Sequence, residues 1–218
     1  SHIHLTGGHM AAVVAFVSQK GGVGKSTLAR ALAREAAAGG LRVKVADLDT
    51  QQGTSVDWHR QRLQAGIEPA VSVEAFATAA QALAVADGYD ILIIDGPART
   101  SQATAEIAKA ANLVVQPSGA SLDDLRPAVR EFHALVKAGI PADRLTFALN
   151  RIGTAAEEAD ARAYLEEAGY AVLAGCLLER PAYRQAQNGG HAVTETRFAG
   201  LRAQADALIQ SLIDKATE

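Results

Sequence analysis

The sequence predicts an α/β fold, in which a mostly parallel, twisted sheet is covered by helices on both faces. Two observations favour it. Short, continuous apolar runs recur along the chain, as in buried parallel strands, and the stretches between them place alanine, leucine and charged residues at helical spacing. A chain of 218 residues is long enough for one sizeable core and short for two, so we expect a single domain.

Five apolar runs are the expected long strands of this sheet. Buried parallel strands are apolar on both faces, which distinguishes such runs from the alternating pattern of a half-exposed strand. The runs cover residues 11–17, 41–47, 89–95, 111–117 and 144–150. Residues 71–88 predict a further short strand followed by a helix.

Helices are expected at residues 27–38, 122–139 and 156–169, and residues 197–216 predict a closing amphipathic helix. Right-handed crossovers place such helices on both faces of the sheet. Each of the first three ends at a glycine, a residue that stops many helices. These glycines are Gly39, Gly139 and Gly169. Ligands of open sheets bind beyond the carboxyl ends of the strands, so the site is expected there.

The composition excludes several classes of protein. Hydrophobic residues make up 49% and charged residues 21%, and no apolar run approaches the roughly 20 residues of a membrane span. The lone Cys176 cannot form an intramolecular disulfide or a C-x-x-C site, which fits a reducing cytoplasm. The net charge of −3 gives no global electrostatic case for nucleic acid, so any such surface must be a local patch.

The first ten residues, SHIHLTGGHM, hold three of the six histidines and end in the only methionine, Met10. We interpret residues 1–9 as an expression remnant and residues 10–218 as the native domain. A metal site in these histidines is the alternative. No helix-turn-helix extension is expected before the first strand.

The stretch SQKGGVGKST at residues 18–27 predicts a phosphate-binding loop between the first strand and the first helix, which is expected to begin near Lys25. Glycines let successive backbone amides face an anion, and the helix N-terminus adds the positive end of its dipole. Lys25 is expected against the β- and γ-phosphates, Ser26 on Mg²⁺, and Thr27 near the α-phosphate. The expected cradle is Gly21, Gly22, Val23, Gly24, Lys25, Ser26 and Thr27.

The loop departs from the usual G-x-x-x-x-G-K-[ST] pattern, because Gln19 occupies the position of the opening glycine and an extra lysine, Lys20, follows it. The sequence K-G-G-V-G-K-S-T resembles the deviant Walker A signature of the ParA/MinD ATPases. The resemblance implies a P-loop NTPase in which ATP bridges a homodimer and Lys20 reaches the partner's phosphates as a catalytic cation. Cations supplied in trans raise rates by about 10³–10⁵ in other phosphoryl-transfer enzymes.

Two apolar runs end in carboxylates that suit a magnesium site. Asp95 closes ILIID in the Walker B manner and is the expected metal-shell residue. The resemblance places Asp49 in a switch region, with a role in metal binding and hydrolysis, although Thr50 replaces the family's proline. Gly96 likewise replaces a frequent threonine. Asp47 either caps the strand end or takes part in the site.

The resemblance also implies where the base and DNA bind. Asn150, after the run RLTFALN, is expected to recognise adenine, and the segment around Arg180 and Pro181 to pack on the base. A strand-ending turn residue is the alternative for Asn150. Basic residues that could contact DNA phosphates in the ATP dimer are Arg180, Arg184, Arg197, Arg202 and Lys215, although acidic residues interrupt them.

The resemblance extends over roughly residues 10–200 and is nearest to short plasmid-type partition ATPases. It implies a cytoplasmic, nucleoid-associated ATPase with weak basal activity, using ATP and Mg²⁺. Such a protein dimerises on ATP, binds DNA without sequence preference, and hydrolyses ATP when stimulated by a centromere-binding or cargo adaptor protein. We therefore expect a role in plasmid or chromosome segregation.

Alternatives remain open. A related ATPase could position a protein cargo, such as a carboxysome or a chemoreceptor cluster. A nucleotide-gated binding module with negligible hydrolysis is a second alternative, which Thr50 favours. The tail QSLIDKATE is mixed in charge and lacks bulky aromatic residues, so a membrane-targeting helix is not expected.

Overall fold

The structure, a computed structural model, describes residues 10–22, 24–50, 54–98 and 101–218. Within these residues, seven strands form one sheet in which every pair is parallel. The strands are β1 Ala12–Ser18, β2 Val43–Asp47, β3 Ser72–Ala75, β4 Ile91–Ala98, β5 Leu113–Ser118, β6 Leu145–Ile152 and β7 Ala171–Leu178. Their order across the sheet is β3-β2-β4-β1-β5-β6-β7, so the first strand lies at the centre.

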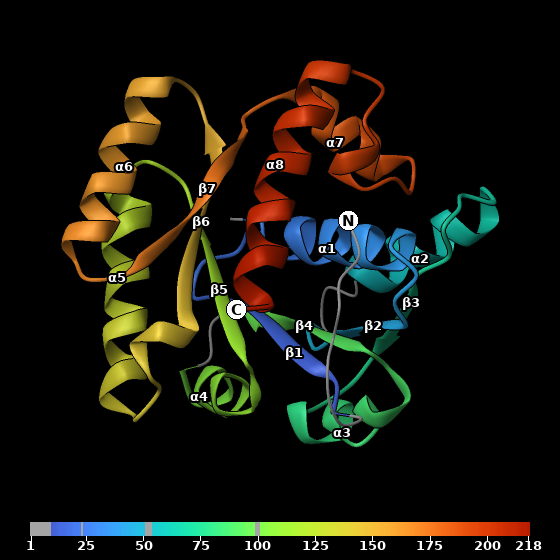
Figure 1. Ribbon diagram of the computed structural model, residues 1–218, viewed down its shortest axis with the longest axis horizontal. Helices are drawn as coiled ribbons and strands as arrows, with labels where there is room; N and C mark the ends of the chain where they lie inside the picture. The colour runs from blue at the N-terminus through green and yellow to red at the C-terminus, as the bar shows by residue number, and fades with distance from the viewer. Residues whose placement is uncertain (1–9, 23, 51–53, 99–100) are drawn as a thin grey trace.

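Helices pack on both faces of the sheet (Figure 1). One core cluster joins the sheet to α3, α4, α5 and α6, and a second joins the opposite face to α1, α7 and α8. Successive residues of β1 alternate between the two clusters, since strand side chains point to opposite faces. The helices are α1 Lys25–Ala38, α2 Thr54–Gln64, α3 Ala79–Leu83, α4 Ser101–Ala110, α5 Leu122–Lys137, α6 Ala155–Glu167, α7 Pro181–Asn188 and α8 Ala199–Ala216.

The register of the central strands brings two acidic residues together. Asp47 at the end of β2 is aligned with Asp95 of β4, and Phe16 of β1 is aligned with the same Asp95. Both carboxylates are buried. Because parallel strands end at the same edge, the acids predicted after separate apolar runs lie beside the loop that follows β1.

The predicted single-domain α/β fold is confirmed, and all five apolar runs are strands. The sheet is parallel throughout the described residues rather than mostly parallel. The segment 71–88 contains β3 and α3 as predicted, and α1 begins at Lys25. Gly139 (φ 100°) and Gly169 (φ 99°) follow their helices in the left-handed conformation, whereas after α1 Gly40 (φ 87°), not Gly39, adopts it. Residues 1–9, interpreted as an expression remnant, lie outside the described residues.

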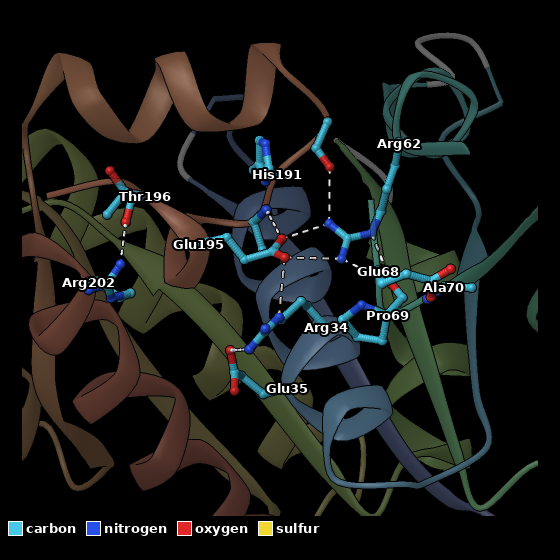
Figure 2. A network of polar contacts seen from close by, with 12 residues as sticks. Arg34, Glu35, Arg62, Glu68, Pro69, Ala70, His191, Glu195, Thr196 and Arg202 are labelled. Carbon is cyan, nitrogen blue, oxygen red and sulfur yellow. Dashed lines mark hydrogen bonds and ion pairs between the residues drawn. The ribbon is translucent and has the colours of Figure 1, made fainter. Parts of the chain in front are cut away.

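Helix α2 is held by a buried arginine rather than by an apolar stripe (Figure 2). Arg62 is 1% exposed and forms an ion pair with Glu195 at 2.6 Å. It also donates to the carbonyl oxygens of Pro69 (3.0 Å) and Gly190 (3.1 Å). Arg34 of α1 forms a second ion pair with Glu195 at 3.3 Å. Glu195 thereby ties α2 and α1 to the turn that follows α7.

Gly190 shows how closely α2 packs on this turn. Its φ is +84°, and a Cβ built on it would lie 2.9 Å from the backbone nitrogen of Arg62. Such a contact is too close for any side chain, so the two backbones meet directly. In the described part of the chain, none of the helices is long and apolar enough to cross a bilayer.

Candidate functional site

A cavity of about 850 Å³ opens at the carboxyl ends of the strands, between the β1–α1 loop, the end of β6 and helix α7. Most of the residues predicted to bind nucleotide line it, and Pro181 lies next to it as the first residue of α7. Val23 lies outside the described residues. The predicted residues on the cavity wall are Gly21, Gly22, Gly24, Lys25, Ser26, Thr27, Asp49, Asn150, Arg180 and Arg184.

The loop backbone has the conformation of an anion cradle. Gly22 (φ 76°) and Gly24 (φ 111°) are both left-handed, a conformation that strains other residues. Gly24 is the N-cap of α1 and supplies no side chain to bond the first amides of the helix. A Cβ on Gly24 would collide with the side-chain amide of Asn150, and the left-handed φ would strain any other residue, so glycine suits this position. The amides of the first turn thus face the cavity with the helix dipole behind them.

Lys25 lies inside the cavity wall. Its Nζ donates to the hydroxyl of Ser18 at 2.9 Å, and that hydroxyl donates to the carbonyl of Lys20 at 2.8 Å. Burial lowers the pKa of Lys25, while the charges of Asp95 and Asp49 act in the opposite direction. Lys25 is therefore a pre-positioned cation at the place where phosphate would enter.

Lys20 lies elsewhere, although the two lysines are only five positions apart. Its ammonium forms an ion pair with Asp124 in the first turn of α5, and its side chain is 55% exposed. It lines a smaller hollow of about 380 Å³, together with Asp124, Arg151 and Glu179, and not the large cavity. One lysine of the loop therefore lies on the cavity wall and the other on the outer surface.

Asp95 is buried, and its two carboxylate oxygens have different surroundings. Its Oδ2 accepts hydrogen bonds from the hydroxyls of Ser26 (2.8 Å) and Ser55 (2.9 Å). Its Oδ1 is buried without a hydrogen-bond partner among the described residues. Burial raises the pKa of Asp95, against the opposing effects of Ser26, Ser55, Arg30 and Lys25.

These groups fit Mg²⁺, which is usually bound by one or two carboxylates with the remaining ligands from water and substrate phosphates. The unpartnered oxygen of Asp95 and the Ser26 hydroxyl are hard oxygen donors at the base of the phosphate cradle. Among the described residues, no cluster of three histidines, cysteines or acids could hold a metal alone. A bound ion would therefore need nucleotide or water oxygens as well.

Asp47 and Asp49 have different surroundings. The carboxylate of Asp47 accepts from the amide of Asp49 (3.0 Å) and from the amide of Val56 (3.3 Å). Burial and the charge of Asp95 raise the pKa of Asp47. Asp47 thus fixes the turn after β2 and the start of α2, which is the capping alternative left open by the sequence. Asp49 is half-buried and lines the cavity.

Asn150 and α7 form another part of the cavity wall. Asn150 is buried, and its Oδ1 accepts from the amide of Arg151 at 2.9 Å. Glu179 holds Arg151 and Arg184, each at 2.7 Å. The residues of α7 and its N-cap that line the cavity recur at helical spacing on one face, and they are Arg180, Tyr183, Arg184 and Gln187.

The sequence interpretation missed Arg30 and Gln187. Both line the cavity, and Nη1 of Arg30 donates to Oε1 of Gln187 at 3.0 Å. Arg30 falls within a predicted helix and Gln187 in a segment for which no helix was predicted. A signal for Arg30 existed, because it is the one charged residue in the otherwise apolar run LARALA.

The four residues predicted for DNA alone do not gather in one place. Arg184 is held by Glu179, whereas the guanidinium of Arg197 lies over the Phe198 ring at 4.8 Å. Arg202 donates to the carbonyl of Thr196 at 3.3 Å near the start of α8. Lys215 is 13 residues further along that helix, about 20 Å at 1.5 Å per residue, and pairs with Glu218.

The parallel sheet and the glycine-rich loop at the start of α1 define a nucleotide-binding α/β protein. Residues 14–193 match the model of the CobQ/CobB/MinD/ParA nucleotide binding domain, and the chain belongs to this family. The predicted resemblance to ParA/MinD proteins is thereby confirmed.

One curated relative and several solved structures are similar to this chain. The chain is 29% identical to maintenance of carboxysome distribution protein A of Gloeobacter kilaueensis over 196 residues. These aligned residues make up 89% of each chain. A Cyanothece McdA variant in complex with ATP superposes with a TM-score of 0.69 at 19% identity, covering 94% of this chain and 97% of that one.

Two further structures cover 94% of this chain and 99% of their own, each with a TM-score of 0.69. They are the cell division ATPase MinD of Pyrococcus furiosus, at 20% identity, and a putative plasmid partition protein of Borrelia burgdorferi B31 bound to AMPPNP, at 15%. At these identities the structural likeness shows the shared fold alone.

Proposed function

We propose that this chain is an ATPase that dimerises on ATP, binds DNA without sequence preference in that state, and takes part in plasmid or chromosome segregation. The observation that carries the proposal is the separate placement of the two lysines of one loop. Lys25 lies buried in the cavity wall, whereas Lys20 is half-exposed outside the cavity and held by an ion pair with Asp124. A surface ion pair of this kind is weak, so Lys20 can exchange Asp124 for an anion on a second copy.

ATP would bind with its phosphates on the loop. Gly22, Gly24, Lys25 and Thr27 line the cavity where the triphosphate is expected. The base would lie between Asn150 and the start of α7 at Arg180 and Pro181. The cavity of about 850 Å³ is within the usual size range of small-molecule and cofactor sites.

Mg²⁺ would be held by Ser26 and by Asp95, with Asp49 nearby, and when bound it neutralises charge that develops on the phosphates. Asp49, half-buried on the cavity wall, is the residue proposed to orient the attacking water. The partner's Lys20 would add a cation from outside the cavity. Because this cation arrives only in the dimer, hydrolysis in the monomer should be weak.

DNA would bind across the dimer through basic residues of the last third of the chain, of which Arg184 lines the cavity, whereas Arg197 and Arg202 lie near the start of α8. Lys215, at the far end of α8, is the weakest of these candidates. A centromere-binding or adaptor protein would stimulate hydrolysis and release the DNA. The protein would then act on the nucleoid in the cytoplasm.

A second candidate is the positioning of a protein cargo. The observation that favours it is the 29% identity, over 196 residues, to a protein that maintains carboxysome distribution. The cavity and the two lysines serve both functions equally, so the difference lies in the adaptor protein. A third candidate is a nucleotide-gated binding module with negligible hydrolysis, favoured by Thr50 in place of the family's proline.

Sedimentation velocity tests the central claim. The chain is examined with ADP, ATP and a non-hydrolysable ATP analogue, each with and without duplex DNA. We expect a monomer with ADP, a dimer with ATP or its analogue, and co-sedimentation with DNA only in the dimeric state. A chain that stays monomeric with the analogue and Mg²⁺ would contradict the proposal.

Two matched variants separate the roles of the lysines. Lys25→Ala should abolish ATP binding, measured by calorimetry, whereas Lys20→Ala should bind ATP almost normally but remain monomeric and lose stimulated turnover. Loss of binding in both variants would place Lys20 in its own subunit's pocket. The cargo function would be favoured instead if the dimer hydrolyses ATP in the presence of a DNA-bound partner protein but does not position the DNA.

A further inference from the structure

Arg30 is a buried cation that the proposed chemistry does not yet use. It lies on α1 one turn beyond Ser26 and is only 9% exposed. No ion pair to a carboxylate is found for it within the described residues. Burying a charge without a direct counter-ion is costly, so the groups that surround Arg30 must compensate.

The guanidinium of Arg30 makes three directional contacts. Nε donates to the hydroxyl of Ser55 at 3.3 Å, and Nη1 donates to Oε1 of Gln187 at 3.0 Å. The ring of Trp58 lies against it, 5.5 Å from the guanidinium carbon to the ring centre. A planar fork that is stacked on an aromatic ring has its donor directions fixed.

The contact with Ser55 leads to Asp95, the carboxylate proposed to bind Mg²⁺. An arginine side chain only donates hydrogen bonds, so Ser55 must accept from Arg30 and direct its single proton elsewhere. That proton goes to Oδ2 of Asp95, 2.9 Å away, which also accepts from Ser26. With both donors on Oδ2, the unpartnered Oδ1 is the oxygen left for a metal.

The second contact leads to the proposed α-phosphate position. Because Oε1 of Gln187 must face the arginine, the NH₂ group of the same side chain faces the other way, and its Nε2 donates to the hydroxyl of Thr27 at 3.0 Å. Thr27 therefore accepts from Gln187, and its own proton remains to be donated to a ligand. Thr27 lines the cavity, so a phosphate oxygen there can accept it.

The two branches close into a ring of hydrogen bonds. Ser26 and Thr27 are neighbours on α1, and the bonds run from Thr27 through Gln187, Arg30, Ser55 and Asp95 back to Ser26. The ring connects α1, α2, β4 and α7 around the phosphate end of the cavity. Burial lowers the pKa of Arg30, and the charges of Asp95 and Asp47 counteract it, which supplies the missing compensation at a distance.

We propose that Arg30 is a positioning residue that couples metal binding to nucleotide binding: one guanidinium orients the Ser55–Asp95 pair toward Mg²⁺ and the Gln187–Thr27 pair toward the α-phosphate. The proposal rests on the proposed function only in placing a nucleotide and Mg²⁺ in this cavity. It does not depend on dimerisation, hydrolysis or DNA.

Binding of a fluorescent ADP analogue tests it without any catalytic step. The analogue is titrated in EDTA and at a series of Mg²⁺ concentrations. In Arg30→Met we expect the half-saturating Mg²⁺ concentration to rise at least about tenfold, as found when groups that orient metal ligands are removed. The affinity for the analogue in EDTA should fall several-fold as well.

Single-branch variants give the controls. Ser55→Ala should reproduce the magnesium effect with little change in EDTA, and Gln187→Leu should weaken binding in EDTA with the Mg²⁺ half-saturation unchanged. The double variant Arg30→Met/Ser55→Ala should need no more Mg²⁺ than Arg30→Met alone, because both changes break one chain. Additive effects would overturn the proposal, since they would mean that Arg30 does not act through Ser55.

Arg30→Lys keeps the inference testable if Arg30→Met does not fold. A single ammonium cannot bond Ser55 and Gln187 in the same geometry as the fork, so we expect it to lose at least one branch while melting close to the wild-type temperature. Wild-type values for both the Mg²⁺ and the EDTA titrations would overturn the proposal. A wild-type chain that binds no ADP or ATP at all would instead contradict the proposed function itself.

Discussion

Two ion pairs in this molecule have opposite surroundings. Arg62 and Glu195 are 1% and 9% exposed, and the arginine is also bonded to two carbonyl oxygens. Lys20 and Asp124 are 55% and 22% exposed, and they join the phosphate loop to the first turn of α5. The second pair lines the smaller hollow beside the cavity, whereas the first lines neither.

The difference separates a permanent connection from an exchangeable one. A buried charge that loses its partner is left without water to replace it, so Arg62 and Glu195 cannot part without partial unfolding. An exposed ammonium is solvated whether or not its partner is present, so its pair contributes little. The molecule therefore keeps its rigid ion pair where α2 is anchored, and its weak one at the face proposed to meet a second copy.

The largest effect is expected from breaking the buried pair. Glu195→Ala leaves Arg62 buried without its counter-ion and should lower the free energy of unfolding by about 3–5 kcal/mol, measured by urea denaturation. The double variant Arg62→Met/Glu195→Leu should be more stable than Glu195→Ala, because no unpaired charge remains. If the double variant loses the full sum of the losses measured for Arg62→Met and Glu195→Leu alone, the two residues are not coupled.

The buried pair should also give a distinct pH dependence. Burial alone would raise the pKa of Glu195, but its hydrogen bonds from Arg62 and Ala192 and the charges of Arg62 and Arg34 prevail and lower it below 4.5. A depressed carboxyl pKa stabilises the fold above the unfolded value, and this stabilisation is lost as pH falls through the folded pKa. The stability difference between wild type and Glu195→Gln should be constant above about pH 4.5 and shrink below it. A difference that persists unchanged to pH 3 would contradict this.

A smaller effect on stability is expected at the exposed pair. Lys20→Ala should change the free energy of unfolding by no more than about 1 kcal/mol, because both partners are solvated when apart. Thermal melting without nucleotide measures it. A loss as large as that of Glu195→Ala would mean that Lys20 holds the loop in place, and would weaken its proposed role on a second copy.

The smallest effect is that of salt. At 1 M NaCl the screening length is about 3 Å, so the stability difference between wild type and Asp124→Asn should fall to a few tenths of a kcal/mol. The loss in Glu195→Ala should remain, since salt does not reach the buried pair. Equal salt dependence of the two variants would remove the distinction between the pairs.

The parts that the sequence predicts are those governed by local rules. The apolar runs predict the strands, because a strand covered on both faces must be apolar throughout. The glycines and Lys25 predict the loop, and the acid that ends the run at Asp95 predicts the carboxylate beneath it. These features depend on short stretches of chain, and the structure has them where they were expected.

The parts that the sequence does not predict are set by contacts between distant segments. Helix α2 was not predicted, because its buried residues are Ser55, Trp58 and Arg62 rather than an apolar stripe. Gln187 meets Thr27 across 160 positions, and Asp124 meets Lys20 across 104. Such partners are chosen by the packing of α7 and α5 on the sheet, which no local pattern records.

The hydrogen atom that serves as the side chain of Gly190 has a mechanical consequence. The backbone of α2 packs directly on this residue, and Arg62 donates to its carbonyl oxygen. Helix α2 and the turn that follows α7 should therefore move together. A displacement of α2 should be passed on to the turn after α7, and so to the part of the cavity wall that α7 forms.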